Sequence, residues 1–241
     1  MKKCEIEIAN RSEISVTNRF DEKEQINKDE FVSRAINKDY WNQRYAAKEY
    51  IWTVTANQFL VAETADLPIG SALELATGEG RNAVWLAEQG WSVCAIDFSE
   101  QAIEKAEFLA ESKGVLNRVK FKTEDLNEYQ PECGQFDLVT LIYLQLPFDK
   151  IKPILQNAVK SLKSGGTFLL IAHDPKNLIH GFGGPQQPEL LYTKEQVIDV
   201  ISDLAFSEAI EIVKATQVER LVNSYSGNKI ALDCIVKAKK L

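Results

Sequence analysis

Residues 72–106, ALELATGEGRNAVWLAEQGWSVCAIDFSEQAIEKA, decide the fold. The stretch has the pattern of an apolar strand, a turn, an amphipathic helix, a second apolar strand and the start of another helix. Gly78 and Gly80 lie in the turn, where glycine lets a ligand approach the backbone and the free N–H groups of a helix start face it. We therefore expect this turn to bind a nucleotide-like or anionic ligand.

The same alternation continues outward from this stretch. The predicted strands are 72–76, 92–97, 119–123, 136–143 and 167–172, and the predicted helices between them are 81–89, 99–113 and 150–162. Such strand–helix–strand connections cross over right-handed, so they predict a parallel sheet with helices on both faces. Two last apolar runs, 209–222 and 229–237, are joined by a short turn and are expected to pair antiparallel.

The amino-terminal part of the chain has a different character. Residues 1–38 are charged and mixed in sign, so we predict a helical appendage or arm, with a lid or oligomer contact as the alternative. Residues 39–241 are predicted to form the main domain, which opens with a helical cover. Trp41, Tyr45 and Trp52 in this cover suit the hydrophobic core best, although aromatic rings also bind cationic ligands.

Composition narrows the possible partners. The chain of 241 residues has 28 Lys and Arg against 35 Asp and Glu, a net charge of -7 and no basic stripe, which argues against nucleic acid. No long apolar run predicts a membrane span or a signal peptide. Four widely spaced cysteines, Cys4, Cys94, Cys133 and Cys234, form no C-x-x-C pair, so we expect no metal site and a reducing, cytoplasmic compartment. A monomer or homodimer is expected.

The glycine turn alone does not identify its ligand. Residues 78–83 also satisfy the dinucleotide fingerprint G-x-G-x-x-A, and Asp97 stands about 20 residues on, where a ribose-binding acid belongs. This motif alone does not distinguish NAD from S-adenosylmethionine. Three features favour S-adenosylmethionine: the charged Glu74 inside the first strand, Asp125 beside the apolar Leu126 after the third strand, and the antiparallel end of the chain.

The chain from about residue 40 to residue 240 resembles the class I S-adenosylmethionine-dependent methyltransferases, and among them the tellurite-resistance and thiopurine-type small-molecule enzymes. The segments that carry the resemblance are ELATGEGRNAVWLAEQGWSVCAIDFSEQAIEKA, TEDL, FDLVTLIYLQLP, LKSGGTFLLIAHD and GGPQQPELLYT. The resemblance implies a Rossmann-like three-layer αβα sandwich. Its seven-stranded sheet would be mostly parallel with the last strand antiparallel, and the cofactor would lie at the carboxyl ends of the first strands.

The resemblance also implies roles for individual residues. Gly78 and Gly80 would cradle the methionine part, Asp97 would receive the ribose hydroxyls, and Asp125 with Leu126 would frame the adenine. The complete set of expected cofactor-binding residues is Glu74, Ala76, Gly78, Gly80, Arg81, Asn82, Asp97, Phe98, Asp125, Leu126 and Tyr143.

Several of these assignments have alternatives. Glu74 could simply bond the loop, and Glu124 could replace Asp125. Arg81 could bind the methionine carboxylate or pair with Glu79 or Glu88. Ala76 stands where many members have glycine, a tolerable change if its φ stays negative.

The acceptor side gives weaker signals. The fourth strand ends in Tyr143-Leu-Gln-Leu-Pro147, so the Asn/Asp-Pro-Pro-Tyr pattern of methyltransferases that act on amide or exocyclic nitrogens is absent. Tyr143 and His173 are the candidate catalytic residues, although His173 could equally be structural. The glycine-rich residues 181–185 could form a lid.

Methyl transfer depends mainly on alignment of donor and acceptor, and a soft anionic acceptor needs no base. Since the sequence has two histidines and no visible nucleophile–base pair, we predict a small-molecule acceptor, with thiols or chalcogen oxyanions ahead of amines. An NAD-dependent oxidoreductase and a non-catalytic S-adenosylmethionine-binding module are the alternatives.

Overall fold

The computed structural model of the chain describes residues 33, 37–203, 209–224 and 227–241. Most of the predicted extension, residues 1–38, therefore lies outside the described residues, as does Cys4. The described strands are β1 (Ser71–Leu75), β2 (Ser92–Asp97), β3 (Val119–Thr123), β4 (Phe136–Ile142), β5 (Leu162–His173), β6 (Ile210–Ser224) and β7 (Gly227–Lys240).

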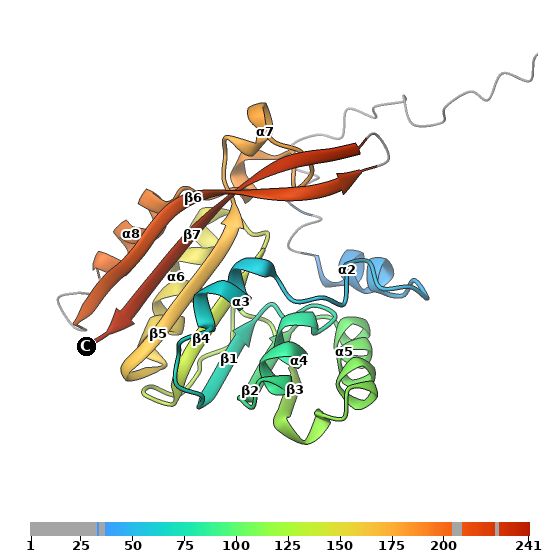
Figure 1. Cartoon of the computed structure of the whole chain (residues 1–241), viewed down its shortest axis with the longest axis horizontal. Coiled ribbons are helices and arrows are strands. Elements are labelled where there is room, and N and C mark those ends of the chain that lie inside the picture. The colour runs from blue at the N-terminus through green and yellow to red at the C-terminus, as the bar shows by residue number, and fades with distance from the viewer. Residues whose placement is uncertain (1–32, 34–36, 204–208, 225–226) are drawn as a thin grey trace, which may run out of the picture.

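These strands form one seven-stranded sheet in the order β3-β2-β1-β4-β5-β7-β6 (Figure 1). The strands β1 to β5 pair parallel with one another. β7 is antiparallel to both β5 and β6, between which it is inserted. The fold is thus the Rossmann-like sandwich with an antiparallel last strand that the resemblance implied.

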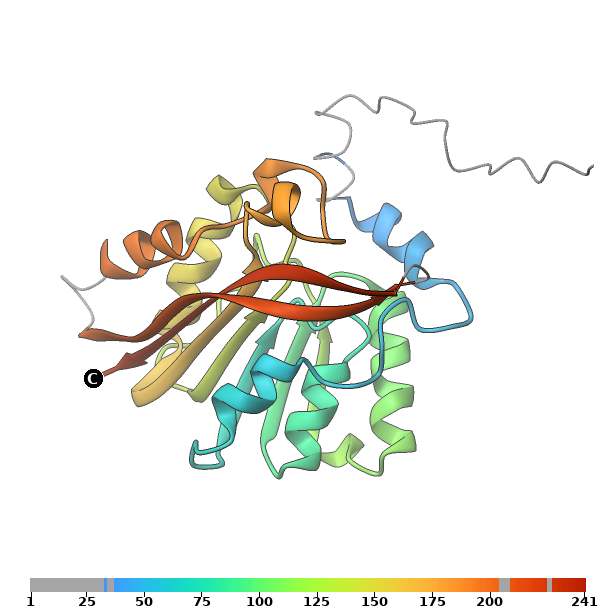
Figure 2. The same ribbon diagram turned by 45° about the horizontal axis from the view of Figure 1, so that its top comes forward.

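Helices cover both faces of the sheet (Figures 1 and 2). The described α-helices are α2 (Lys38–Tyr45), α3 (Gln58–Thr64), α4 (Arg81–Glu88), α5 (Glu100–Ser112), α6 (Phe148–Lys160), α7 (Asn177–His180) and α8 (Lys194–Asp203). α3, α4 and α5 lie on one face, and α6 and α8 on the other. No described helix is both long and apolar enough to cross a membrane.

The central strands are apolar on both faces because each face is covered. Leu73 and Leu75 of β1 belong to the core beneath α6 and α8, whereas Ala72 packs with residues of α3 and α4. Successive side chains of a strand point to opposite faces, so a strand buried on both sides reads as a continuous apolar run. This explains why the sequence pattern located the strands.

The predicted boundaries of α6 and the predicted start of β5 are wrong. α6 begins at Phe148 rather than at residue 150, because Pro147 stands at its N-cap and proline suits the start of a helix. The same helix was predicted to reach residue 162, yet β5 already begins at Leu162. β5 pairs with β4 through a register shift between Phe136 and Leu138, an irregularity that an apolar-run search does not recognise.

The topology places two features at the same edge of the sheet. The strand order reverses between β1 and β4, and ligands of open α/β sheets bind at the carboxyl ends of the strands at such a point. The β6–β7 hairpin extends past this edge (Figure 2). The last pair that joins β5 to β7 is His173 with Asp233, and beyond it β6 and β7 pair only with each other.

Candidate functional site

The glycine turn joins β1 to α4 in a left-handed conformation. Ala76, Gly78 and Gly80 have φ angles of 58°, 55° and 81°. A Cβ at Gly80 would lie 2.5 Å from the Cβ of Ala106 on α5, so glycine is required there for packing as well as for φ. The condition for a tolerable alanine at position 76, a negative φ, is not met, since this residue adopts the conformation that glycine favours.

Asp97, at the end of β2, holds the turn in place. Its Oδ2 accepts a hydrogen bond from the Gly78 N–H at 2.8 Å and its Oδ1 accepts one from the Ser99 N–H at 3.0 Å. The side chain is buried, and burial raises its pKa to about 6. Each carboxylate oxygen can accept more than one hydrogen bond, so Asp97 can fix the turn and still bind a ligand.

Glu74 lies beneath the turn, where it is 1% exposed. It accepts a hydrogen bond from the Thr77 hydroxyl at 2.6 Å, and burial raises its pKa to about 7. Asn82, the second residue of α4, accepts a hydrogen bond from the Asn57 N–H at 2.9 Å. Both side chains therefore support the turn and the start of α4 from inside the protein.

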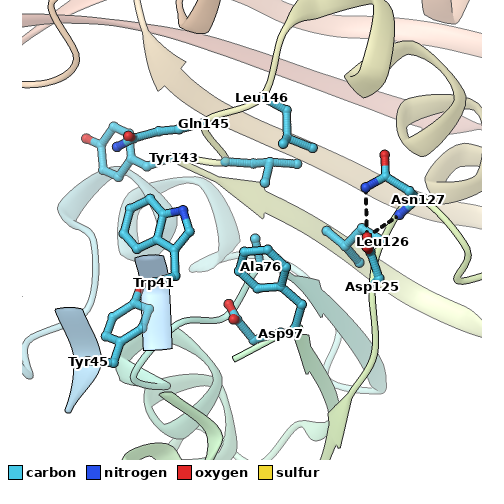
Figure 3. Close-up of a pocket in the computed structure, with 12 residues that line it drawn as sticks. Trp41, Tyr45, Ala76, Asp97, Asp125, Leu126, Asn127, Tyr143, Gln145 and Leu146 are labelled. Atoms are coloured by element: carbon cyan, nitrogen blue, oxygen red, sulfur yellow. Dashed lines mark hydrogen bonds between the residues drawn. The ribbon is translucent and has the colours of Figure 1, made fainter. Parts of the chain in front are cut away.

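A cleft opens above the turn, with an empty volume of about 620 Å³ that includes the space at its mouth. The lining residues are Trp41, Tyr45, Ala76, Asp97, Phe98, Asp125, Leu126, Asn127, Tyr143, Leu144, Gln145 and Leu146. In the view of Figure 3, the aromatic rings of Trp41, Tyr45 and Tyr143 lie on one side of the cleft, and Asp125, Leu126 and Asn127 on the other.

The third strand supplies the acid at the rim of the cleft. Asp125 is exposed, and its Oδ1 accepts hydrogen bonds from the backbone and side-chain nitrogens of Asn127, both at 2.8 Å (Figure 3). The alternative acid, Glu124, pairs with Lys122 at 3.7 Å and does not line the cleft. The geometry therefore favours Asp125 over Glu124 for contact with a ligand.

Arg81 opens α4 and has no hydrogen-bond or ion-pair partner among the residues that the structure describes. The acids that could have neutralised it bond elsewhere: Glu79 accepts from Lys105 and from the backbone of Ile51, and Glu88 pairs with Lys113. Burial lowers the pKa of the Arg81 guanidinium, while Tyr143 and Glu74 oppose this shift. The unpaired guanidinium is suited to an anionic ligand group.

A second polar group lies next to the cleft, where β4 and β5 end beside the β6–β7 hairpin. The fully buried carboxylate of Asp233 accepts hydrogen bonds at Oδ2 from the Tyr143 hydroxyl and from Arg220 Nε, each at 2.7 Å. Its Oδ1 is 2.9 Å from His173 Nδ1. Burial works to raise the pKa of Asp233, but the bonds from His173 and Arg220 outweigh it and hold this pKa below its usual range.

The rings of Tyr143 and His173 stack, with centroids 4.6 Å apart and an angle of 20° between their planes. Tyr143 has a φ of 57°, a rare and strained value for a bulky residue that is found most often at functional sites. A Cβ at Gly184 would lie 3.0 Å from the Cδ2 of His173, so the predicted lid segment lies directly against the imidazole. Within the described part of the chain, no group of three or more His, Cys, Asp or Glu side chains could hold a metal ion.

Comparison with known proteins shows what this site belongs to. Residues 72–166 match the protein-family model described as a methyltransferase domain. This match identifies residues 72–166 as a methyltransferase domain. A 2-heptyl-1-hydroxyquinolin-4(1H)-one methyltransferase of Mycobacteroides abscessus is 25% identical over 140 residues, 55% of this chain and 61% of that protein. A tRNA 5-carboxymethoxyuridine methyltransferase of Escherichia coli K12 is 28% identical over 119 residues, 44% of this chain and 41% of that protein.

A solved structure shares the fold over most of the chain. The N-methyltransferase NodS from Bradyrhizobium japonicum WM9, in complex with S-adenosyl-L-homocysteine, superposes with a TM-score of 0.62 and 15% identity. The match covers 84% of this chain and 97% of that one. The aligned stretches span 61% and 41% of the two curated relatives' own lengths. The comparisons thus show the domain and its fold.

Six of the residues predicted to bind the cofactor of this methyltransferase domain line the cleft: Ala76, Asp97, Phe98, Asp125, Leu126 and Tyr143. The other five, Glu74, Gly78, Gly80, Arg81 and Asn82, form or support the turn beside it. Trp41 and Tyr45 line the cleft as well, whereas Trp52 is 40% exposed and packs against the guanidinium of Arg44.

Sequence reasoning missed two kinds of residue. The first is the segment Leu144–Leu146 with Asn127, which follows the ends of β4 and β3 and could have been found by the rule that ligands bind at strand ends. The second is Asp233 with Arg220. Asp233 lies 60 residues from His173 and 90 from Tyr143 along the chain, and no local pattern joins them. The sequence showed no acid–imidazole pair, but the structure forms one between Asp233 and His173.

Proposed function

We propose that this protein binds S-adenosylmethionine in the cleft and transfers its methyl group to a small-molecule acceptor. The observation that supports this best is that two acids, Asp97 and Asp125, at the ends of neighbouring strands, line one cleft above the glycine turn. When bound, S-adenosylmethionine supplies a methyl group on a positively charged sulfur. The protein's task is to align it with the acceptor and exclude water.

Each group has a task in this proposal. Asp97 accepts hydrogen bonds from the ribose hydroxyls, and Asp125 with Leu126 holds the adenine at the rim. Arg81 binds the carboxylate of the methionine part, for which its unpaired guanidinium is suited. The aromatic rings of Trp41 and Tyr143 exclude water and favour the cationic sulfur by cation–π attraction, which contributes about 0.5–2 kcal/mol.

The acceptor is proposed to be a small molecule. A net charge of -7 disfavours an RNA substrate, although one curated relative is a tRNA methyltransferase, because RNA binding depends on cationic surfaces. The relative from Mycobacteroides abscessus is named for a hydroxyquinolinone, a small molecule with a hydroxyl group. Thiols and chalcogen oxyanions were favoured because the sequence showed no base. The structure pairs His173 with Asp233, so a candidate base is present. The lack of a base therefore no longer favours thiols and chalcogen oxyanions over hydroxyl acceptors.

Calorimetric titration with S-adenosylhomocysteine and, separately, with NAD tests the cofactor assignment. We expect micromolar binding of S-adenosylhomocysteine alone, at about -8 kcal/mol, weakened at least tenfold in Asp97→Ala. Asp149→Ala, which changes an exposed acid at the start of α6, is the matched control and should bind as the wild type does. Binding of NAD instead would support the oxidoreductase alternative.

Turnover separates an enzyme from a binding module. Formation of S-adenosylhomocysteine from S-adenosylmethionine, followed across a panel of hydroxyl, thiol and amine acceptors, is the expected result. Donor binding without product from any acceptor would instead support the non-catalytic module.

A further inference from the structure

The Asp233 cluster lies where an acceptor would approach. The donor cleft is built by β1, β2 and β3 and by the segment after β4, so the neighbouring edge of β4, β5 and β7 remains for the second substrate. Tyr143 lines the cleft, and the imidazole of His173 stacks directly on the Tyr143 ring at 4.6 Å. The side chain of His173 therefore lies one ring away from the donor site, on its acceptor side.

The hydrogen bonds to Asp233 fix the proton on one imidazole nitrogen. A carboxylate only accepts hydrogen bonds, so the contact of 2.9 Å between His173 Nδ1 and Asp233 Oδ1 requires the proton to be on Nδ1. Arg220 and Tyr143 both donate to the other oxygen of Asp233, which keeps this buried carboxylate ionised. The second nitrogen, Nε2, then carries a lone pair, and it makes no hydrogen bond to any residue that the structure describes.

The imidazole is held in one orientation. The Tyr143 ring covers one side of it, and the backbone of Gly184 approaches so closely that a Cβ there would lie 3.0–3.1 Å from Cδ2, Cγ and Nε2. Gly184 has a φ of 74°, and Asn177 anchors its neighbour Gly183 through a hydrogen bond of 2.7 Å to the carbonyl. A ring held by its neighbours and by a buried acid has the orientation that proton transfer requires.

We propose that His173 is the general base of methyl transfer, that Asp233 is its positioning residue, and that the acceptor is a small molecule whose nucleophile is a hydroxyl group still protonated at neutral pH. The proposal rests on the proposed function. Nε2 of His173 takes the hydroxyl proton as the oxygen lone pair forms the bond to the methyl carbon. The carbon–sulfur bond breaks with its electron pair going to sulfur. The imidazolium is paired with the Asp233 carboxylate and returns its proton to water after product leaves.

Thiols provide the contrast, because aryl thiols are already ionised at neutral pH and need no base. The test uses 2-naphthol and 2-naphthalenethiol as matched probes, with formation of S-adenosylhomocysteine as the readout. We expect His173→Gln to lower kcat/KM for 2-naphthol by about 10²–10⁴-fold and to change that for the thiol by less than about tenfold. Asp233→Asn should act in the same direction. His180→Gln, which changes the chain's other histidine, should leave both rates unchanged.

The pH profile gives a further readout. The wild-type rate with 2-naphthol should fall as the solution becomes acidic, since a protonated imidazole cannot accept the proton, and this acid limb should be absent in His173→Gln. The titratable groups that contact the imidazole are Asp233 and Tyr143, and the charged Arg220 shares the Asp233 carboxylate with it. Equal loss on both probes, or no loss on 2-naphthol, would overturn the proposal.

Nitrogen-15 NMR of the imidazoles in the complex with S-adenosylhomocysteine is independent of turnover. With two histidines in the chain, His180→Gln assigns the remaining signals to His173. We expect the proton on Nδ1 and a lone pair on Nε2 at neutral pH. A proton on Nε2 would refute the base, and this measurement decides the question if neither probe is methylated. Unchanged S-adenosylhomocysteine binding by His173→Gln would show that the donor site is intact, whereas no binding by the wild type would overturn the proposed function itself.

Discussion

At the scale of the residue, Glu74 makes stability depend on pH. Burial raises its pKa from the ordinary 4.5 to about 7, so between these values the folded chain keeps a proton that the unfolded chain releases. The stabilisation is complete below pH 4.5 and is lost as the pH rises through 7. Asp97, whose pKa burial raises from 3.8 to about 6, acts in the same direction at lower pH.

Glu74→Gln should remove this dependence, because the amide resembles the neutral acid and can still accept the hydrogen bond from Thr77. Relative to the wild type, the variant should gain stability between about pH 5 and pH 8, by on the order of 3 kcal/mol at 1.36 kcal/mol per pKa unit. Urea unfolding at several pH values measures the difference. Glu128→Gln, an exposed substitution, is the control. A constant difference between Glu74→Gln and the wild type would contradict the assignment of the proton to Glu74.

The position of a residue in the site could be predicted where it depends on the sequence pattern close to that residue. Asp97 ends β2 and Asp125 lies two residues after β3. The carboxyl ends of parallel strands meet at one edge of the sheet, so the sequence pattern predicted that both acids lie at the cleft. The left-handed φ of Ala76 and Tyr143 has no such signal, because neither residue type favours it. The partners of His173 depend on the register of β5 with β7, which the pairing of long strands determines and a local pattern does not.

At the scale of the element, α3 depends on Asn57, the N-cap residue that precedes it. Asn57 Oδ1 accepts hydrogen bonds from the N–H groups of Phe59 at 2.8 Å and Leu60 at 3.3 Å. We expect Asn57→Ala to lower the free energy of unfolding by about 1–2 kcal/mol, whereas Asn57→Ser, which keeps a capping oxygen, should lose much less. Urea unfolding of the three proteins measures this. Equal losses in the two variants would show that the cap is not what stabilises α3.

The order and type of the main elements followed from the sequence because each central strand is buried on both faces and each helix has one apolar face. Their ends were less predictable. Pro147 at the start of α6 and the register shift that lengthens β5 depend on local backbone geometry, which hydrophobic periodicity does not describe. The cover before β1 was predicted as helical, and it consists of α2 and α3 separated by a segment without regular structure.

At the scale of the whole molecule, the donor site joins the first complete helix of the described chain to the ends of the central strands. α2 supplies Trp41 and Tyr45 to the cleft and is held against α5: Asn42 donates to Glu100 at 3.1 Å and accepts from the Ser99 hydroxyl at 2.6 Å. Lys38 also pairs with Glu100. These contacts tie the cover to the same helix start that follows Asp97, so the amino-terminal helix belongs to the site.

Two truncations test where the functional domain begins. Removal of residues 2–36 leaves α2 and its contacts, so the affinity for S-adenosylhomocysteine should stay within about threefold of the full chain, less than 1 kcal/mol. Removal of residues 2–46 also deletes Trp41 and Tyr45 and opens one side of the cleft to water. We expect that truncation to weaken binding at least tenfold, or about 1.4 kcal/mol. Circular dichroism of both truncated proteins controls for folding. A tenfold loss in the shorter truncation would mean that residues before 37 take part in the site, and full affinity in the longer one would mean that α2 does not.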